Sequence, residues 1–563
     1  MLCQQARGCG SYGGTLHPSA SVHPPDRLGR GRDVHRRERR QFHLSAVPPN
    51  AAQVPESVRA HNPSQKGEPL FRFWHDEKRF KGDGLTSLAQ RTLIKLGGQR
   101  KGGNIKSDPS NGQMGWEVPG EWDVLWSPSS TAQRALSLQP LLPNHCVNAV
   151  LGSRALTRKK NLGSTLRSAY GSDAFSRIMP TTFEIPSQLR QWIAYLKQHK
   201  EDGSGEEAPD PLACGPNTLW VLKTAENLGK GIRVVEQKYA LKEFLERAQR
   251  HMEAKDKKQV RQFLAVQRYV ENPLLINGCK FGLRVWVAVT SVDPLRVYLH
   301  SNGLVLFSSK EYDEEVTEDQ QGHLTNYAQN VDGEVWDLGM LLNHVGLEAF
   351  TKILAEIKQR VALTFAAAAG KLRASAACHH EAYSYELFGL DFLVDDACVP
   401  WLLEVNATPS LAVEHQNIEV ERMIHQAKAG MIADLFSLVR IPGRYTNNKH
   451  NPNSKHDQEG ELLAVLLAEL DSRAGFEPLM HLLPSTQEAE DEGWRIALSK
   501  EDEVVRSWFK QQVQPVHLQA PHMLHSPDCP GPDAQTRFGP LAPSVVAVEH
   551  MPSHLHHSSK KCA

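Results

Sequence analysis

Residues 386–411 read ELFGLDFLVDDACVPWLLEVNATPSL, two apolar runs joined by a short polar turn. Runs of this length and composition predict two neighbouring buried strands. Because alternate residues of a strand face the same side, Glu404 and Asn406 share a face and can meet Asp391 from the other strand. Carboxylate and amide oxygens suit Mg²⁺, and an unpaired carboxylate between apolar runs is costly without a cation. The stretch therefore predicts a magnesium site, with two strands that simply end in acids as the alternative.

A second informative stretch lies upstream, where residues 218–232 read TLWVLKTAENLGKGI. Lys223 ends a predicted strand, and Gly229, Lys230 and Gly231 follow in a loop whose backbone N–H groups can approach phosphate oxygens. The segment matches neither the GxxxxGKS/T loop nor the GxGxxG turn of other nucleotide-binding proteins. It predicts a phosphate-binding strand and loop, and the alternative is a surface hairpin with an ordinary lysine.

Residues 267–284, QRYVENPLLINGCKFGLR, join a strand end to a second extended segment. The backbone at the strand end can pair with the edge of an adenine. Lys280 and Arg284 are four residues apart, so they lie on one face of an extended chain. Two such cations form a solvated surface in most proteins, but facing a triphosphate they would clamp it. Further on, HLTNYAQN places Thr325 beside Asn326, for which a turn or helix N-cap is the alternative.

The remaining pattern predicts an α+β fold, because period-2 and period-3.6 segments are mixed along the chain. We predict strands at 71–74, 122–126, 219–223, 264–270, 283–290, 295–299, 304–307, 387–394 and 401–405, with a turn-rich link at 107–120. We predict helices at 85–96, 187–199, 237–252, 347–368, 419–439, 459–470 and 501–512, the last with a capping box of Ser499 and Asp502.

Composition sets limits on the class of protein. The 563 residues include 40% apolar residues and 40 glycines, an ordinary globular level, and no apolar run approaches the 18 residues of a membrane span. Nine scattered cysteines without a CxxC pair suggest a reducing compartment. The 64 basic and 64 acidic side chains cancel, so only local charge is informative.

Both ends of the chain are expected to be disordered. Residues 1–67 form an Arg-, Pro- and Gly-rich tail, for which an organelle transit peptide is an alternative, and residues 515–563 form a His- and Pro-rich tail. Between them we expect one enzyme unit at 68–441, divided into an N-terminal lobe at 68–145, a central lobe at 146–263 and a C-terminal lobe at 264–441. A linker with accessory helices follows at 442–514.

Taken in order, these segments resemble the tubulin–tyrosine-ligase-like family of ATP-grasp amino-acid ligases. The resemblance rests on LTRKK at 156–160, WVLK followed by GKGI at 220–232, QRYVENPLLINGCKF at 267–281, HLTN at 323–326, ELFGLDFLVD at 386–395 and WLLEVNATPSL at 401–411. It implies an ATP-grasp core, ATP and Mg²⁺ as cofactors, and a reaction that joins an amino acid to a tubulin carboxylate through an acyl phosphate. Glutamate is the expected amino acid, with glycine and tyrosine as alternatives.

The resemblance also implies a role for each motif residue. The catalytic residues would be Lys280, Arg284 and Glu404, and the metal ligands Asp391, Glu404 and Asn406. The nucleotide and amino acid would be held by Lys159, Lys223, Gly229, Lys230, Gly231, Ile232, Gln267, Arg268, Tyr269, Val270, Lys280, Arg284, Thr325 and Asn326.

Three departures from the family pattern bear on activity. Gly282 stands where KFDxR is usual, Leu306 stands where a hairpin arginine is usual, with Asn302 in place of its glutamate, and the loop after Lys223 is one residue short. The loss of two charges suggests a slow enzyme, a changed substrate, or a protein that binds tubulin without modifying it.

The expected partners are tubulin or microtubules and an amino acid, with no nucleic acid and no membrane. We expect a monomer in the cytoplasm on the cytoskeleton, with the cilium or the flagellar basal body as a further location. Acidic tubulin tails call for a cationic surface, and the candidates are Arg154, Arg158, Lys160 and the helix carrying Arg247, Arg250, Lys255, Lys257 and Lys258. That helix also carries glutamates, so a mixed solvated face is the alternative.

Overall fold

The computed structural model describes most of the predicted enzyme unit. The described residues are 69–75, 88–101, 106–108, 115–118, 120–139, 141–198, 218–226, 231–256, 259–313, 320–325, 330, 333–376, 382–446, 458–485, 488–489, 494–496 and 498–513. The tails predicted at 1–67 and 515–563 lie outside them, as do Gly229, Lys230, Asn326, Lys257 and Lys258. Within the described ranges, none of the helices combines the length and apolarity needed to cross a bilayer.

A small parallel sheet is built mainly from the N-terminal part of the chain. Its order is β15-β6-β5-β1-β2, and each neighbouring pair is parallel. The strands are β1 (Phe71–His75), β2 (Gly98–Lys101), β5 (Val124–Trp126), β6 (Cys146–Val147) and β15 (Tyr383–Ser384). Because β15 comes from residues far along the sequence, this sheet is completed only when the C-terminal part of the unit has folded.

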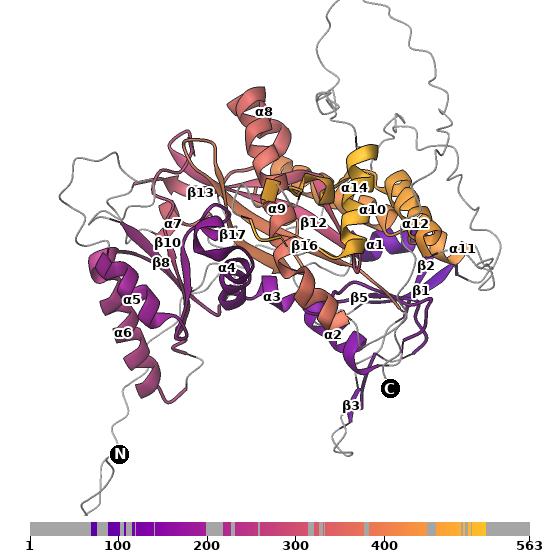
Figure 1. Ribbon diagram of the computed structural model, residues 1–563, viewed down its shortest axis with the longest axis horizontal. Coiled ribbons are helices and arrows are strands. Elements are labelled where there is room, and N and C mark those ends of the chain that lie inside the picture. Colours follow the sequence, from indigo (N-terminus) through magenta and orange to yellow (C-terminus); the bar gives the residue numbers. More distant parts are fainter. Residues whose placement is uncertain are drawn as a thin grey trace, which may run out of the picture. The chain divides into compact units, whose positions relative to one another are not determined.

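A second, antiparallel sheet has the order β7-β10-β8-β9. Helices α5 (Leu189–Gln198) and α6 (Gln237–Glu253) lie beside it (Figure 1) and bury Trp192 and Phe244 against Trp220 on β8. Apolar contact of this kind holds the helices to the sheet. The strands are β7 (Thr182–Glu184), β8 (Leu219–Thr224), β9 (Ile232–Glu236) and β10 (Phe263–Arg268).

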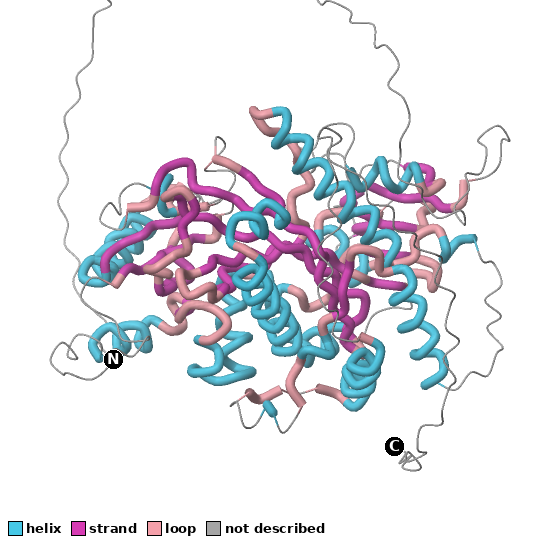
Figure 2. The backbone as a smooth tube through the Cα atoms, turned by 90° about the horizontal axis from the view of Figure 1, so that it is seen from above, coloured by secondary structure: helices cyan, strands magenta, loops and turns pink. Residues whose placement is uncertain are grey.

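The largest sheet is also antiparallel and has the order β14-β13-β12-β16-β17, with β11 on β12 and β18 on β13. Its long strands have helices on both sides (Figure 2), and the long helix α9 packs on β12, β13 and β17. The strands are β11 (Leu275–Ile276), β12 (Cys279–Val292), β13 (Leu295–Glu311), β14 (Val335–Asp337), β16 (Glu386–Val394), β17 (Pro400–Ala407) and β18 (Phe476–Pro478).

The other helices surround these sheets or connect them. They are α1 (Leu88–Lys95), α2 (Ser129–Leu138), α3 (Arg154–Thr157), α4 (Lys159–Ser176), α7 (Gln320–His323), α8 (Leu338–Val345), α9 (Leu347–Ala376), α10 (Ile418–Leu438), α11 (Gly443–Thr446), α12 (Gln458–Ser472), the 3₁₀ helix η3 (Met480–Leu482) and α14 (Lys500–Gln512). The predicted capping box of α14 is confirmed, since the Ser499 hydroxyl accepts from the Asp502 N–H at 3.1 Å and the Asp502 carboxylate accepts from the Ser499 N–H at 3.0 Å.

The mixed α+β class is confirmed, but two local predictions were wrong. The turn-rich link at 107–120 contains a two-stranded hairpin of β3 (Lys106–Asp108) and β4 (Gly115–Glu117). The segments at 295–299 and 304–307 belong to the single strand β13, because the polar residues between them form a bulge and not a turn. Val285 pairs with Gly303 and Val287 with Leu299, so residues 300–302 lie opposite one residue of β12.

Candidate functional site

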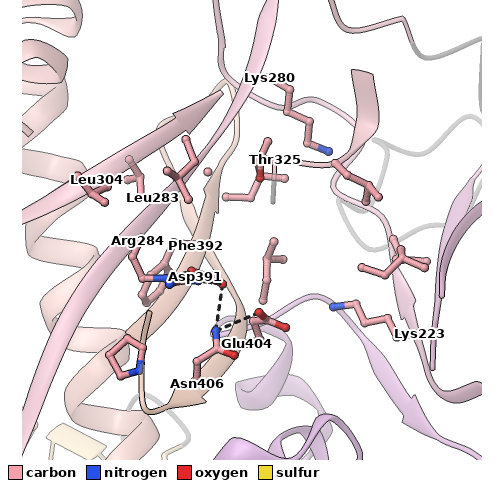
Figure 3. Close-up of a pocket in the computed structure, with 18 of the residues that line it drawn as sticks. Lys223, Lys280, Leu283, Arg284, Leu304, Thr325, Asp391, Phe392, Glu404 and Asn406 are labelled. Atoms are coloured by element: carbon pink, nitrogen blue, oxygen red, sulfur yellow. Dashed lines mark hydrogen bonds and ion pairs between the residues drawn. The ribbon is translucent and has the colours of Figure 1, made fainter. Parts of the chain in front are cut away.

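A cavity of about 410 Å³ lies between the two antiparallel sheets. Strands β8, β9 and β10 contribute residues from one side and β12, β13, β16 and β17 from the other. Figure 3 labels ten of the lining residues, with Lys223 of β8 opposite Asp391 of β16 and Glu404 of β17. Thirteen of the residues predicted from the sequence line it: Lys159, Lys223, Ile232, Gln267, Arg268, Tyr269, Val270, Lys280, Arg284, Thr325, Asp391, Glu404 and Asn406. Gly231 precedes β9 and is not among the residues that line the cavity.

The acidic group is brought together by strand register. Asp391 on β16 is the direct partner of Glu404 on β17, and Asn406 follows two residues on, so the three side chains share the cavity face. The Asn406 amide donates to Asp391 at 3.2 Å and to Glu404 at 3.0 Å. These bonds appear as dashed lines in Figure 3. Arg284 on β12, the partner of Asp391 on its other side, forms a two-pronged ion pair with it, one bond measuring 2.8 Å.

Burial opposes ionisation of both carboxyl groups. It raises the pKa of Asp391 to about 6 despite the adjacent Arg284 guanidinium. Burial acts in the same direction on Glu404, but hydrogen bonds from Asp391 and Asn406 and the charge of Lys223 lower its pKa overall. Two carboxylates that one arginine does not fully neutralise are a set of hard oxygen donors, and this set fits a divalent cation such as Mg²⁺.

Lys223 and Lys159 bring positive charge to the opposite wall. The ammonium of Lys223 donates to the Gln267 side chain at 2.6 Å, and Gln267 donates in turn to the Thr182 hydroxyl at 2.8 Å, which links β8, β10 and β7. Burial lowers the pKa of Lys223 to about 8, and the nearby Glu404 partly offsets this. Lys159 donates to the carbonyl of Glu226 at the start of the predicted glycine loop. The lysines therefore face the acidic group across the cavity.

The backbone geometry of the turn before β9 requires a glycine at position 231. Its φ of +69° lies in the left-handed region, and a Cβ at this position would lie 2.1 Å from the Thr224 hydroxyl oxygen. The close approach lets β9 return directly beside β8, where Ile232 pairs with Lys223. The turn therefore sets the register that places Ile232 in the cavity.

Lys280 enters the cavity from β12 and lies beside Thr325 (Figure 3). Its ammonium donates to the Tyr269 hydroxyl at 2.7 Å, and the same hydroxyl lies 2.7 Å from Nδ1 of His323. Burial lowers the pKa of Lys280 to about 7. Thr325 lies two residues after the end of the short helix α7.

The two charge-losing departures turn out to be neighbours. Gly282 on β12 and Leu306 on β13 are direct cross-strand partners, and both line the cavity. A Cβ at Gly282 would lie 2.7 Å from the Thr325 hydroxyl oxygen, so Thr325 occupies the space that a side chain there would need. The cavity wall at this point is neutral.

Sequence reasoning assigned no role to several cavity residues, among them His323, Leu304 and Lys428. His323 begins the HLTN segment, of which only the polar pair Thr325 and Asn326 was predicted to contact a ligand. Leu304 could have been found from the strand period, because it pairs with Arg284 and therefore shares the face of Leu306. Lys428 lies on α10 and donates to the Ala412 carbonyl, a contact that nothing in the local sequence indicates.

A second cavity, of about 440 Å³, shares one wall with the first. The shared residues include Lys159, Lys223, Glu404 and Asn406. Its rim adds the cationic side chains predicted as a receiving surface, Arg154, Arg158 and Lys160. The other candidate surface, on α6, is a mixed face, with Arg250 3.6 Å from Glu243 and Lys242 3.9 Å from Glu246.

The chain is similar in sequence to known proteins of one family. Residues 139–448 match the model of the tubulin-tyrosine ligase family. A tubulin polyglutamylase of Mus musculus is 28% identical over 361 residues, 58% of this chain and 24% of that protein. A probable tubulin polyglutamylase of Homo sapiens is 29% identical over 360 residues, 60% of this chain and 54% of that protein. A tubulin monoglutamylase of Mus musculus is 31% identical over 323 residues, 52% of this chain and 23% of that protein.

The chain thus covers about a quarter to about half of the length of these relatives. The residues that match the family model, 139–448, are more than half of the 563 residues of this chain. The chain therefore belongs to the tubulin-tyrosine ligase family.

Proposed function

We propose that this chain is an ATP-dependent ligase that attaches an amino acid, glutamate by preference, to carboxylates of tubulin tails. The observation that carries the proposal is the convergence of Asp391, Glu404 and Asn406 with Lys223 and Lys280 in one cavity between two antiparallel sheets. Oxygen ligands with ammonium groups around them, Lys223 on the facing sheet and Lys280 on the same sheet as the acids, are what a nucleotide triphosphate with Mg²⁺ requires. The names of the relatives, tubulin polyglutamylase and tubulin monoglutamylase, support tubulin and glutamate as substrates.

Each group has a role in this proposal. Asp391, Glu404 and Asn406 would hold the magnesium ions, which when bound neutralise charge on the phosphates. Lys159, Lys223, Lys280 and Arg284 would bind the phosphates. The strand end at Gln267–Val270 would receive the adenine, and Ile232 on β9 would pack beside it. Thr325 would contact the amino acid, together with Asn326, which lies outside the described residues.

The proposed chemistry needs charge stabilisation more than a protein nucleophile. An oxygen of the acceptor carboxylate attacks the γ-phosphorus of ATP, the bond to the β,γ-bridging oxygen breaks, and ADP leaves. The amino group of the donor amino acid then attacks the acyl carbon, and inorganic phosphate leaves as the amide forms. Both steps build negative charge on phosphate oxygens, and Lys223 and Lys280 are placed to stabilise it.

The second cavity offers the acceptor a way in. Its rim carries Arg154, Arg158 and Lys160, and its inner wall is the one that holds Glu404 and Asn406. An acidic peptide held by the rim would bring a carboxylate to the wall shared with the nucleotide cavity. The combined variant Arg158→Ser/Lys160→Ser should weaken tubulin binding most at low salt, and binding that does not change with ionic strength would remove this route from the proposal.

The decisive experiment incubates the purified chain with tubulin, ATP and Mg²⁺ and with each labelled amino acid in turn. Incorporation identifies the donor, and Glu404→Gln should abolish it while leaving the thermal unfolding midpoint close to that of the wild type. Glu419→Gln, an exposed exchange of the same chemistry on α10, is the matched control and should retain full activity. Full activity in Glu404→Gln would refute the proposed metal site.

One observation favours a second candidate, a tubulin-binding module with weak or no ligase activity. The neutral pair of Gly282 and Leu306 removes charge from the cavity wall. Tubulin binding without incorporation of any amino acid would favour this candidate. In either case we expect a cytoskeletal location, and sedimentation with and without microtubules would test it.

A further inference from the structure

A chain of three polar side chains runs along one wall of the nucleotide cavity. Lys280 Nζ donates to Tyr269 Oη at 2.7 Å, and Tyr269 Oη lies 2.7 Å from His323 Nδ1. The three residues come from β12, from the segment after β10 and from the end of α7. All three line the cavity. His323, 54 residues after Tyr269 in the sequence, is thus brought to the same hydroxyl as Lys280 of β12.

The surroundings of Lys280 are neutral and aromatic. Its side chain is only 4% exposed, with the ring centroid of Tyr269 at 4.0 Å and that of Tyr312 at 5.6 Å from the ammonium. His323 is 3% exposed and packs edge-on against both tyrosine rings. Burial is the cause that lowers the pKa of Lys280 to about 7. Among the described residues, cation–π contacts with the two tyrosines and the hydrogen bond to Tyr269 thus hold the ammonium.

Chemistry constrains the direction of the hydrogen bonds. An ammonium group can only donate, so the Tyr269 oxygen accepts from Lys280, and the hydroxyl keeps one hydrogen to donate. The neighbouring Tyr312 hydroxyl donates to the carbonyl of Glu271 at 3.1 Å, and its oxygen is a second acceptor within reach of Tyr269. His323 Nδ1, at 2.7 Å, is the acceptor that completes the chain when the ring carries its hydrogen on Nε2.

We propose that Tyr269 and His323 are positioning residues that fix the ammonium of Lys280 for the phosphate groups of the nucleotide, His323 accepting from Tyr269 and Tyr269 accepting from Lys280. The inference rests on the proposed function for the identity of the ligand. In the proposed function, the strand end that includes Tyr269 receives the adenine and the segment after His323 contacts the amino acid. Holding Lys280 is a separate role for the side chains of Tyr269 and His323.

The test uses variants that remove one member of the chain at a time. Tyr269→Phe keeps the ring and removes the hydroxyl, and His323→Leu removes the acceptor. His323→Asn restores an acceptor oxygen on a short side chain. Tyr170→Phe is the matched control, since it also removes a buried tyrosine hydroxyl, one that donates to the Leu363 carbonyl at 2.6 Å and does not line the cavity.

The first measurement needs no nucleotide. The rate at which a lysine-selective reagent modifies Lys280, followed by mass spectrometry against pH, reports the neutral amine. Tyr269→Phe should move the midpoint of this curve to lower pH, because the ammonium loses its acceptor. His323→Leu should move it in the same direction, while His323→Asn and Tyr170→Phe leave it unchanged. If the pH midpoint of Lys280 modification is the same in Tyr269→Phe as in the wild type, the inference is overturned.

The second measurement is the dissociation constant for ATP, compared with kcat. Tyr269→Phe should raise the dissociation constant about tenfold, as expected for a lost hydrogen bond to a charged group. The double variant Tyr269→Phe/His323→Leu should be no weaker than Tyr269→Phe alone, because both act through one chain, and independent multiplying effects would overturn the inference. If the wild type binds no ATP, the proposed function fails, and the Lys280 modification curve still decides the inference.

Discussion

At Gly282 and Leu306, the effect of a substitution at one position is expected to depend on the residue at the other. They pair across β12 and β13, and the Thr325 hydroxyl fills the space over Gly282. We predict that Gly282→Asp alone displaces Thr325 and lowers kcat/KM, whereas adding Leu306→Arg more than restores it, because the two charges then compensate each other. Neighbouring residues couple by about 0.5–3 kcal/mol. The measurement is a double-mutant cycle on the ligase rate, and additive effects would show that the pair does not act as a unit.

Lys280 makes nucleotide binding depend on pH. Its pKa of about 7 lies well below the ordinary lysine value, so the nucleotide-free ammonium loses its proton as the pH rises through about 7. Phosphate binding favours the charged form, and ATP affinity should therefore fall by up to about tenfold per pH unit above 7. Calorimetry between pH 6 and 9 checks this, with proton uptake on binding at pH 8.

The control for this titration is Lys280→Arg, which keeps its charge over the whole range, so the fall that begins at about pH 7 should disappear and any remaining fall should begin near pH 8, at the pKa of Lys223. The same fall in affinity in that variant would assign the titration to another group.

Much of the candidate site follows from local sequence because strand alternation fixes which side chains share a face. Asp391, Glu404 and Asn406 are such a case, and their register partners meet as the alternation predicts. His323 is different, since its importance arises from a contact with Tyr269, 54 residues away in the sequence. No local period encodes that contact, so the sequence predicted Lys280 and Tyr269 as site residues and missed His323.

At the scale of elements, the segments that sequence reasoning missed are those stabilised by tertiary contacts. Helix α4 contains Gly163 and Gly171, and Gly171 has a non-helical φ of 80° within it. Glycine weakens a helix by about 1 kcal/mol, so no local signal predicted this one. Packing on α9 compensates, including the buried bond from the Tyr170 hydroxyl to the Leu363 carbonyl.

Helix α12 was predicted, but its buried anchor was not. Glu469 accepts from Arg296 at 3.0 Å, from Tyr298 at 2.6 Å and from Thr290 at 3.1 Å, all on β12 and β13. We predict that Glu469→Ala lowers the free energy of unfolding by about 3–5 kcal/mol, because it leaves the Arg296 guanidinium, 8% exposed, without its partner. Chemical denaturation measures this loss.

The apolar exchange Arg296→Met/Glu469→Leu removes both charges and is the informative comparison. It should cost far less than Glu469→Ala, since no buried charge is left alone. An equal loss in both variants would mean that packing of α12, and not the charge, determines stability.

At the scale of the whole molecule, the chain passes directly from the parallel sheet to the largest sheet, since β15 ends at Ser384 and β16 begins at Glu386. The net charge of zero gives no sign that a buried carboxyl group, that of Glu386, lies at this junction. The Glu386 side chain is 1% exposed and accepts from the Val150 N–H at 2.9 Å, while its other oxygen has no hydrogen-bond partner among the described residues. An acid in this position links the two sheets most favourably when it is protonated.

Glu386 therefore makes stability depend on pH. Burial raises its pKa from 4.5 to about 7 in the folded chain, so the folded state binds this proton more tightly than the unfolded state. The contribution is fully present below about pH 4.5 and is lost as the pH rises through about 7, a total of about 3 kcal/mol. Glu386→Gln keeps an acceptor for Val150 and cannot ionise. The thermal unfolding midpoint of this variant, relative to that of the wild type, should rise between pH 5 and 8, and a difference that stays constant over that range would show that Glu386 does not titrate there.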